Sequence, residues 1–351
     1  MTLAELIGAS LMLGIRGCSV NQSETRSDLE ALTGIHCKGI VLFDHDIAGN
    51  HPRNVLSPEQ LEKFIADLRH ELGEDLIVAI DQEGGQVSRL KQEQGFLPSV
   101  SAEEFASWEE IDQRQYAQRQ AKQLKRLGID LNLAPCVDLA VEPHSPIIAE
   151  KGRSFGVDHD KAVRCASIMI QGHMDEGVRC CIKHFPGHGS SLIDSHLGMC
   201  DITQTHTPNE TRVFASLIEC FGDEIAVMPG HLIDKRVDER LPASLSSAHL
   251  SGALRSMLGF EGGIDIEKAT GGKAFMRAVM DQYGDGRSAA MAISAGCDLV
   301  IDGLNAPGYR EPEAPVRIAD AIAKAIGSGR IPHGEERLTQ SRARVDRLFG
   351  R

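Results

Sequence analysis

Short apolar runs recur along the chain, and each ends in polar or glycine-rich residues before a longer stretch with helical spacing begins. This alternation is typical of strands that alternate with helices. The pattern predicts eight strands, in the segments 11–17, 39–46, 76–85, 129–141, 178–185, 225–234, 262–267 and 297–303. Helices are expected over 57–72, 109–127, 158–176, 246–257 and 313–326, with a last one over 334–350.

Eight strand–helix units predict an α/β protein built as a (β/α)8 barrel, because a doubly wound sheet usually has fewer strands and a glycine-rich phosphate loop after the first. No such loop follows the segment 11–17, and no linker or repeat divides the chain. We therefore expect a single domain over residues 1–351.

The N-terminal segment "MTLAELIGASLMLGIRGC" imitates an export signal. Its apolar run lacks a preceding basic stretch, is interrupted by Glu5, and has Arg16 where a cleavage site needs small residues. We expect a helical turn followed by a buried strand instead. No apolar run approaches eighteen residues, so no transmembrane span is predicted.

Charge and cysteine content narrow the class of partner. The chain carries 37 Lys and Arg against 50 Asp and Glu, a net charge of −13, which disfavours nucleic acid and anionic membrane as partners. Its nine cysteines are odd in number and lie mostly in apolar runs, as reduced core residues of a cytoplasmic protein do. The sequence gives no information on the oligomeric state.

Polar side chains end many of the predicted strands. In a barrel, residues at these carboxyl ends form the active site, so a polar ligand is expected there. The residues concerned are Asp44, Asp46, Asp81 to Glu83, Asp138, Lys183, His184, His231, Asp265 and Glu267.

The segment "KHFPGHGSSLIDSH", residues 183–196, concentrates the candidate chemistry. One interpretation is a zinc site formed by His184, His188, Asp194 and His196, although the spacing matches no common zinc motif. A second is a Schiff base on Lys183. A third is an acid/base dyad in which Asp194 orients His196 and raises its basicity.

The run "KHFPGHG" followed by "DSH" resembles the signature of glycoside hydrolase family 3, in its single-domain β-N-acetylhexosaminidase branch. The order of other segments agrees, among them "LFDHDI", "DQEGGQVSRL", "LNLAPCVDLAV", "GRSFG", "PASLSS" and "AGCDLVI", over about residues 5–305. The resemblance implies a retaining exo-β-N-acetylglucosaminidase that acts on muropeptide fragments or similar small glycans, without a cofactor or metal.

The resemblance also implies residue roles. In the family, the residues matching Asp81, Arg89, Arg153, Lys183 and His184 hold the hydroxyls of the terminal sugar, and His196 is the acid/base with Asp194 as its partner. A polyhydroxylated sugar needs such charged hydrogen-bonding groups to fix its orientation. His231, at its own strand end, is assigned to the same substrate-binding set.

The sequence departs from the family at the nucleophile strand, which here reads "GFEGGIDIEKATGG". The nucleophile position falls on Glu267, with Ile266 and Lys268 in place of a serine and a second acid, and Gln86 stands where relatives commonly have arginine. Because alternate strand residues share a face, Asp265 and Glu267 should both point inward, and Glu267 lies nearer the carboxyl end. Glu267 is therefore the favoured nucleophile, with Asp265 as the second candidate.

Two other functions stay open at this point. The altered strand beside a complete sugar-binding set also fits a catalytically impaired protein that binds N-acetylglucosamine. A histidine acid/base, which does not repel an incoming phosphate, also fits a β-N-acetylglucosaminide phosphorylase.

Overall fold

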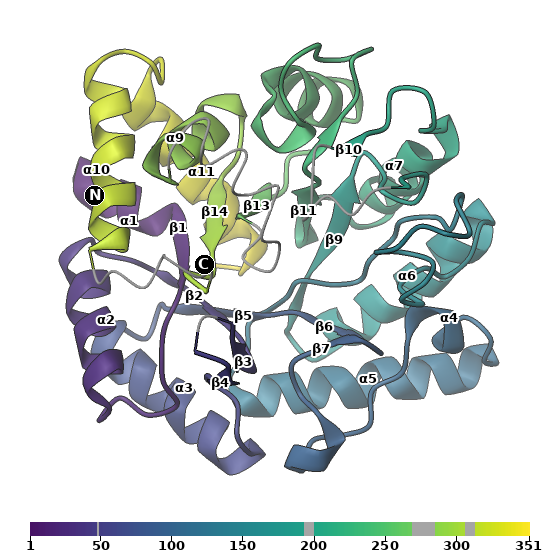
Figure 1. The fold of residues 1–351 in the computed structure, drawn as a ribbon, viewed down its shortest axis with the longest axis horizontal. Helices are drawn as coiled ribbons and strands as arrows, with labels where there is room; N and C mark the ends of the chain where they lie inside the picture. The colour runs from purple at the N-terminus through teal and green to yellow at the C-terminus, as the bar shows by residue number, and fades with distance from the viewer. Residues whose placement is uncertain (48, 193–199, 269–284, 306–312) are drawn as a thin grey trace.

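The computed structural model describes residues 1–47, 49–192, 200–268, 285–305 and 313–351. Its central feature is a sheet of eight parallel strands, one in each segment where the apolar pattern predicts a strand (Figure 1). The strands are β1 (Leu11–Gly14), β2 (Gly39–Leu42), β5 (Ile77–Ile80), β8 (Leu131–Asn132), β9 (Arg179–Phe185), β11 (Ile225–Pro229), β13 (Asp265–Lys268) and β14 (Leu299–Asp302).

The sheet curls, so that its two outermost strands approach each other. The strand order is β11-β9-β8-β5-β2-β1-β14-β13, and a parallel bridge between Val227 and Ile264 joins β11 to the start of β13. Every residue of β1, β2, β5 and β14 is buried. Burial on both faces explains why these strands read as continuous apolar runs rather than as alternating ones.

Helices surround the strands at the periphery of the molecule (Figure 1). They are α1 (Leu3–Ala9), α2 (Ser23–Gly34), α3 (Pro58–Leu72), α4 (Ala102–Phe105), α5 (Glu110–Leu127), α6 (His159–Asp175), α7 (Pro208–Phe221), α9 (Asp285–Ala295), α10 (Ala314–Gly327) and α11 (Gly334–Leu348). A π-helix, η4 (Ala248–Met257), occupies the segment where an α-helix was expected.

The sequence explains the limits of individual helices. Ser57 caps α3 by accepting a hydrogen bond from the Gln60 backbone, and Pro58 occupies the first turn. Gly128 ends α5 with φ 87°, a conformation that an L side chain rarely adopts. The helices α2, α7 and α9, which lie between predicted strands, were not predicted from the sequence.

Three short strand pairs lie outside the main sheet. Two are antiparallel: β3 (His45–Asp46) with β4 (His51–Pro52), after β2, and β6 (Gln82–Gly84) with β7 (Val87–Ser88), after β5. The third pairs β10 (Cys200–Asp201) with β12 (Leu232–Ile233) in parallel. All three follow carboxyl ends of main strands, where the polar residues of the sequence lie.

The N-terminal segment and the cysteines occupy defined places in this fold. Residues 3–9 form a helix that leads directly into the buried strand β1, as predicted. All nine cysteines are free thiols, and seven of them are buried. None of the described helices combines the length and the apolar character that crossing a membrane requires.

Candidate active site

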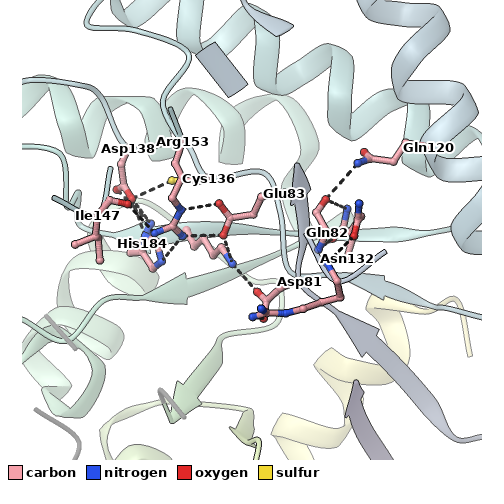
Figure 2. Close-up of polar contacts among 12 residues, drawn as sticks. Asp81, Gln82, Glu83, Gln120, Asn132, Cys136, Asp138, Ile147, Arg153 and His184 are labelled. Carbon is pink, nitrogen blue, oxygen red and sulfur yellow. Dashed lines mark hydrogen bonds and ion pairs between the residues drawn. The ribbon is translucent and has the colours of Figure 1, made fainter. Parts of the chain in front are cut away.

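The site lies at the carboxyl ends of three adjacent strands, β5, β8 and β9. Asp81 directly follows β5, and Asp138 lies in the loop after β8. Lys183 and His184 lie near the carboxyl end of β9. Hydrogen bonds and ion pairs that pass through Glu83 and Arg153 connect their side chains into one polar network, of which Figure 2 labels Asp81, Asp138 and His184. The adjacency of these strands brings together residues that are up to 102 positions apart.

Lys183 connects the two acidic residues of the network. Its Nζ lies 2.7 Å from Asp81 Oδ1 and 2.7 Å from Glu83 Oε1, and its side chain is only 2% exposed. Two carboxylates at this distance favour the charged ammonium. A Schiff-base role requires a neutral amine, so the geometry disfavours that interpretation of Lys183.

Glu83 also receives a bidentate ion pair from Arg153. Arg153 Nε donates to Glu83 Oε2 and Nη2 donates to Oε1, both at 2.7 Å, while Nη1 donates to the backbone carbonyl of Ile147 at 3.0 Å. The planar guanidinium is therefore fixed on two sides. Both side chains are less than 10% exposed, so water screens the pair weakly.

The neighbouring cations favour the ionised form of the two carboxyls, Asp81 and Glu83. Burial alone raises the pKa of the Asp81 carboxyl, but Lys183 and Arg89 outweigh it and the pKa is lowered. Burial likewise raises the pKa of the Glu83 carboxyl, but Arg153 and Lys183 outweigh it, and the pKa is lowered. A ligand at this site therefore meets ionised acceptors and charged donors in fixed positions.

Asp138 orients His184. Its Oδ2 lies 2.6 Å from His184 Nδ1, and its Oδ1 accepts the backbone N–H of His188 at 2.8 Å. Burial opposes ionisation of Asp138, but these histidines lower its pKa to about 2. Burial also lowers the pKa of His184. A neutral His184 that donates Nδ1–H to Asp138 and directs Nε2 toward Arg153, 3.5 Å away, satisfies both contacts.

Arg89 extends the network toward solvent. Its Nη2 lies 3.2 Å from Asp81 Oδ2, its Nη1 lies 3.6 Å from Asp44, and its guanidinium sits over the Phe43 ring at 5.4 Å. Lys91 pairs with the same Asp44 at 2.7 Å. The Arg89 side chain is 25% exposed, which makes it the most exposed of the predicted binding residues in the network.

Five of the six predicted binding residues thus lie in one network: Asp81, Arg89, Arg153, Lys183 and His184. The sixth, His231, follows β11 and lies 2.7 Å through Nδ1 from Ser244 Oγ. The predicted acid/base pair, Asp194 and His196, lies outside the described residues. The alternative zinc set that includes these two residues therefore stays untested.

The two nucleophile candidates occupy different positions along β13. Asp265 is 1% exposed and interacts with Cys181, which precedes Lys183 by two residues on β9. Asp265 therefore lies about 7 Å, or one layer of side chains, below Lys183. The backbone of Glu267 pairs with Ile301 and lies two residues nearer the carboxyl end.

Asp265 has the surroundings of a neutral acid. Burial, with repulsion from Asp298, raises the pKa of its carboxyl to about 8, and its Oδ2 has no hydrogen-bond partner among the described residues. A nucleophile must be ionised and must reach the ligand. The raised pKa and the burial of Asp265 both disfavour it as the nucleophile.

Three residues of the network had no predicted role in the site: Glu83, Asp138 and Cys136. Glu83 and Asp138 were noted only as polar residues near strand ends, and Cys136 was taken for a core thiol. Their sequence neighbourhood gives little indication of a partner, because Glu83 contacts Arg153 across 70 positions and Asp138 contacts His184 across 46.

A curled parallel sheet with a cluster of fixed charges at the carboxyl ends of its strands suits recognition of a small polyhydroxylated ligand. Comparisons with known proteins define the class further. The model of the glycosyl hydrolase family 3 N-terminal domain matches residues 12–348. The chain is 31% identical to a beta-hexosaminidase of Idiomarina loihiensis, over 84% of this chain and 83% of that protein.

Two further relatives agree. A beta-hexosaminidase of Haemophilus influenzae is 29% identical and matches 98% of this chain and 89% of its own length. A family 3 beta-N-acetylglucosaminidase structure from Paenibacillus superimposes with a TM-score of 0.84 at 30% identity; it covers all of this chain, which spans 62% of that structure's length. The protein is a glycoside hydrolase. It belongs to glycoside hydrolase family 3.

Proposed function

We propose that this protein is an exo-β-N-acetylglucosaminidase that hydrolyses terminal β-linked N-acetylglucosamine from small glycans, with muropeptide fragments as the substrate class. The observation that carries the proposal is the buried network of Asp81, Glu83, Arg153, Lys183 and His184, open to solvent on the side of Arg89. The similarity to beta-hexosaminidases and to a beta-N-acetylglucosaminidase supports the choice of sugar.

The network suits a sugar for a physical reason. The hydroxyls of a pyranose need donors and acceptors at fixed separations, and a pre-ordered site loses little conformational entropy when the ligand binds. Here Asp81 offers an ionised acceptor, whereas Arg89, Lys183 and Arg153 offer charged donors. Glu83 and Asp138 hold those donors and His184 in place from behind.

The proposed reaction follows the retaining mechanism. Glu267 attacks the anomeric carbon while His196, oriented by Asp194, protonates the departing oxygen, and water then hydrolyses the glycosyl-enzyme. The position of the Glu267 backbone, one layer above the buried Asp265, supports this assignment. We also infer that the eight strands close as a (β/α)8 barrel, which the bridge between Val227 and Ile264 supports.

The buried free thiols support a reducing compartment, and we place the protein in the cytoplasm on that basis. The proposal includes no cofactor, no nucleic acid and no membrane.

The experiment is a chromogenic assay with a β-N-acetylglucosaminide, beside β-glucoside and β-xyloside controls. The expected result is a clear preference in kcat/KM for the acetylated sugar, and comparable values on all three would contradict it. Product analysis with and without phosphate separates the alternatives. Free sugar means hydrolysis, sugar 1-phosphate means a phosphorylase, and binding without turnover means an impaired homologue, which the altered nucleophile strand makes a specific second candidate.

A further inference from the structure

Behind the sugar-facing side of His184 lies a cluster of three side chains that the proposed hydrolysis uses only in part: Cys136, Asp138 and His184 (Figure 2). One potential ligand atom from each lies within 4.8 Å of the other two. Cys136 Sγ is 3.3 Å from Asp138 Oδ2, which is in turn 2.6 Å from His184 Nδ1. The first two residues are buried, and the His184 side chain is 13% exposed.

These donors have the chemistry of a zinc site. Thiolate, carboxylate and imidazole are the three ligand types that zinc takes in proteins, with bonds of about 2.0–2.3 Å. In tetrahedral geometry such bonds place neighbouring ligand atoms about 3.4 Å apart. The distance from Sγ to Oδ2 already fits, and the distance from Oδ2 to Nδ1 needs to open by less than about 1 Å.

The charges of the cluster also fit. A Cys136 thiolate and the Asp138 carboxylate together balance a divalent cation, and neutral His184 adds no charge. The nearest guanidinium, that of Arg153, is already paired with Glu83 through two hydrogen bonds. A loaded site would therefore bury no uncompensated charge, which is the main energetic cost of burying ions.

Cys136 has no role in the proposed sugar chemistry. In the absence of a cation its thiol donates a hydrogen bond to Asp138 Oδ2, 3.3 Å away. A divalent cation reverses this, because a coordinating thiol loses its proton.

We propose that Cys136, Asp138 and His184 form a binding site for one soft divalent cation, with Zn²⁺ as the ion of choice. Binding forms a metal–sulfur, a metal–oxygen and a metal–nitrogen bond. The thiol proton goes to solvent, and the His184 proton moves from Nδ1 to Nε2. The fourth position, on the side where His184 is exposed, is left for water.

A consequence follows that rests on the proposed function. Because His184 is also a predicted sugar ligand, a bound cation repositions its imidazole and takes Asp138 away from it. Zn²⁺ and N-acetylglucosamine should therefore weaken each other's binding by the same factor.

The test begins with Co²⁺ added to the reduced, metal-free full-length protein, because Co²⁺ adopts zinc-like geometry and a thiolate ligand gives it a strong near-ultraviolet charge-transfer band. The expected result is one equivalent of Co²⁺ bound, with this band, and its displacement by Zn²⁺. Co²⁺ bound without the band, or no binding at all, would overturn the proposal without the use of any variant.

Zn²⁺ affinity measured by calorimetry then identifies the thiol. Cys136→Ala should weaken binding by more than about 10-fold, the lower limit for loss of even a supporting partner. Cys180→Ala is the matched control, because Cys180 is another buried thiol but lies in the apolar core. Equal affinity in both variants would contradict the assignment.

The last arm repeats the Zn²⁺ titration at saturating N-acetylglucosamine. Weaker Zn²⁺ binding supports the consequence drawn for His184. Unchanged Zn²⁺ binding, with the thiolate band intact, would contradict the placement of the sugar at His184 and so the proposed function at this site, while the metal site would stand.

Discussion

Replacement of Glu83 by glutamine removes one negative charge from between two buried cations. Glu83 accepts two hydrogen bonds from Arg153 and lies 2.7 Å from Lys183, whose side chain is 2% exposed. In the variant, Asp81 alone is left to balance Lys183, and Arg153 loses its bidentate partner. Breaking a buried ion pair in this way costs about 3–5 kcal/mol, since a charge is left without compensation.

The magnitude can be converted into a measurable shift. For a chain of this size, 1 kcal/mol corresponds to about 2 °C in Tm, so Glu83→Gln should lower Tm by roughly 6–10 °C. The control is Glu110→Gln. Glu110 pairs with Arg114 on the surface of α5, both being more than half exposed, and such pairs contribute only about 0.3–0.5 kcal/mol.

The pH dependence gives an independent check. The pKa of Glu83 is lowered in the folded protein, so its contribution is present above the pKa of the unfolded chain and is lost as the pH falls through the folded value. The difference in Tm between wild type and Glu83→Gln should therefore be largest near neutral pH and shrink toward acid. Differential scanning calorimetry at several pH values measures this. A shift equal to that of Glu110→Gln, or one independent of pH, would refute the reasoning.

Four further predictions concern the other candidate residues. Asp138→Asn should raise KM at least about 10-fold with a smaller change in Tm than Glu83→Gln, because it releases the His184 ring that Asp138 holds at 2.6 Å; steady-state kinetics and calorimetry on one preparation check this, and an unchanged KM would contradict it. Asp265→Asn should gain in Tm relative to wild type as the pH rises toward about 8. The pKa of Asp265 is raised to about 8 in the folded protein, so between the unfolded and the folded pKa the carboxyl ionises more readily in the unfolded chain, and wild type loses stability. Unfolding at pH 5 and 9 measures the gain, and a pH-independent difference would count against it. Glu267→Gln should abolish the glycosyl adduct that a 2-fluoro sugar traps in wild type, as seen by intact mass, whereas an adduct mapped to Asp265 would overturn the assignment; wild-type turnover itself should be slow, since the longer side chain moves the attacking oxygen by about 1 Å. His196→Ala should cost about 10²–10⁴ in rate on substrates with poor leaving groups and less on activated ones, with a weaker effect of the same kind in Asp194→Asn; equal losses on both kinds of substrate would mean that this loop only positions the sugar.

The sequence by itself determined the strands and most of the sugar-binding residues. Seven of the eight strands lie within the predicted segments and β13 extends one residue beyond its segment, to Lys268, because strands buried on both faces are apolar throughout and this is visible locally. Five predicted binding residues lie in one network: Asp81, Lys183 and His184 lie at the ends of main strands, Arg89 directly follows β7, and Arg153 comes from the loop between β8 and α6. The helices α2, α7 and α9 were not predicted, although α7 carries a capping signal in its Thr207 and Glu210 pair.

Only the tertiary structure decided which charged side chains form ion pairs. Lys183 is paired with Asp81 across 102 positions, and Arg153 with Glu83 across 70. It also decided that Asp138 holds His184, that Cys136 completes a cluster of metal-ligand type, and that Asp265 lies a layer below the site as a neutral acid. The physical reason is that burial and pairing of a charge depend on which strands are neighbours. That order, β5-β8-β9 in this sheet, arises from packing of the whole chain and is not encoded in the residues adjacent to each charged group.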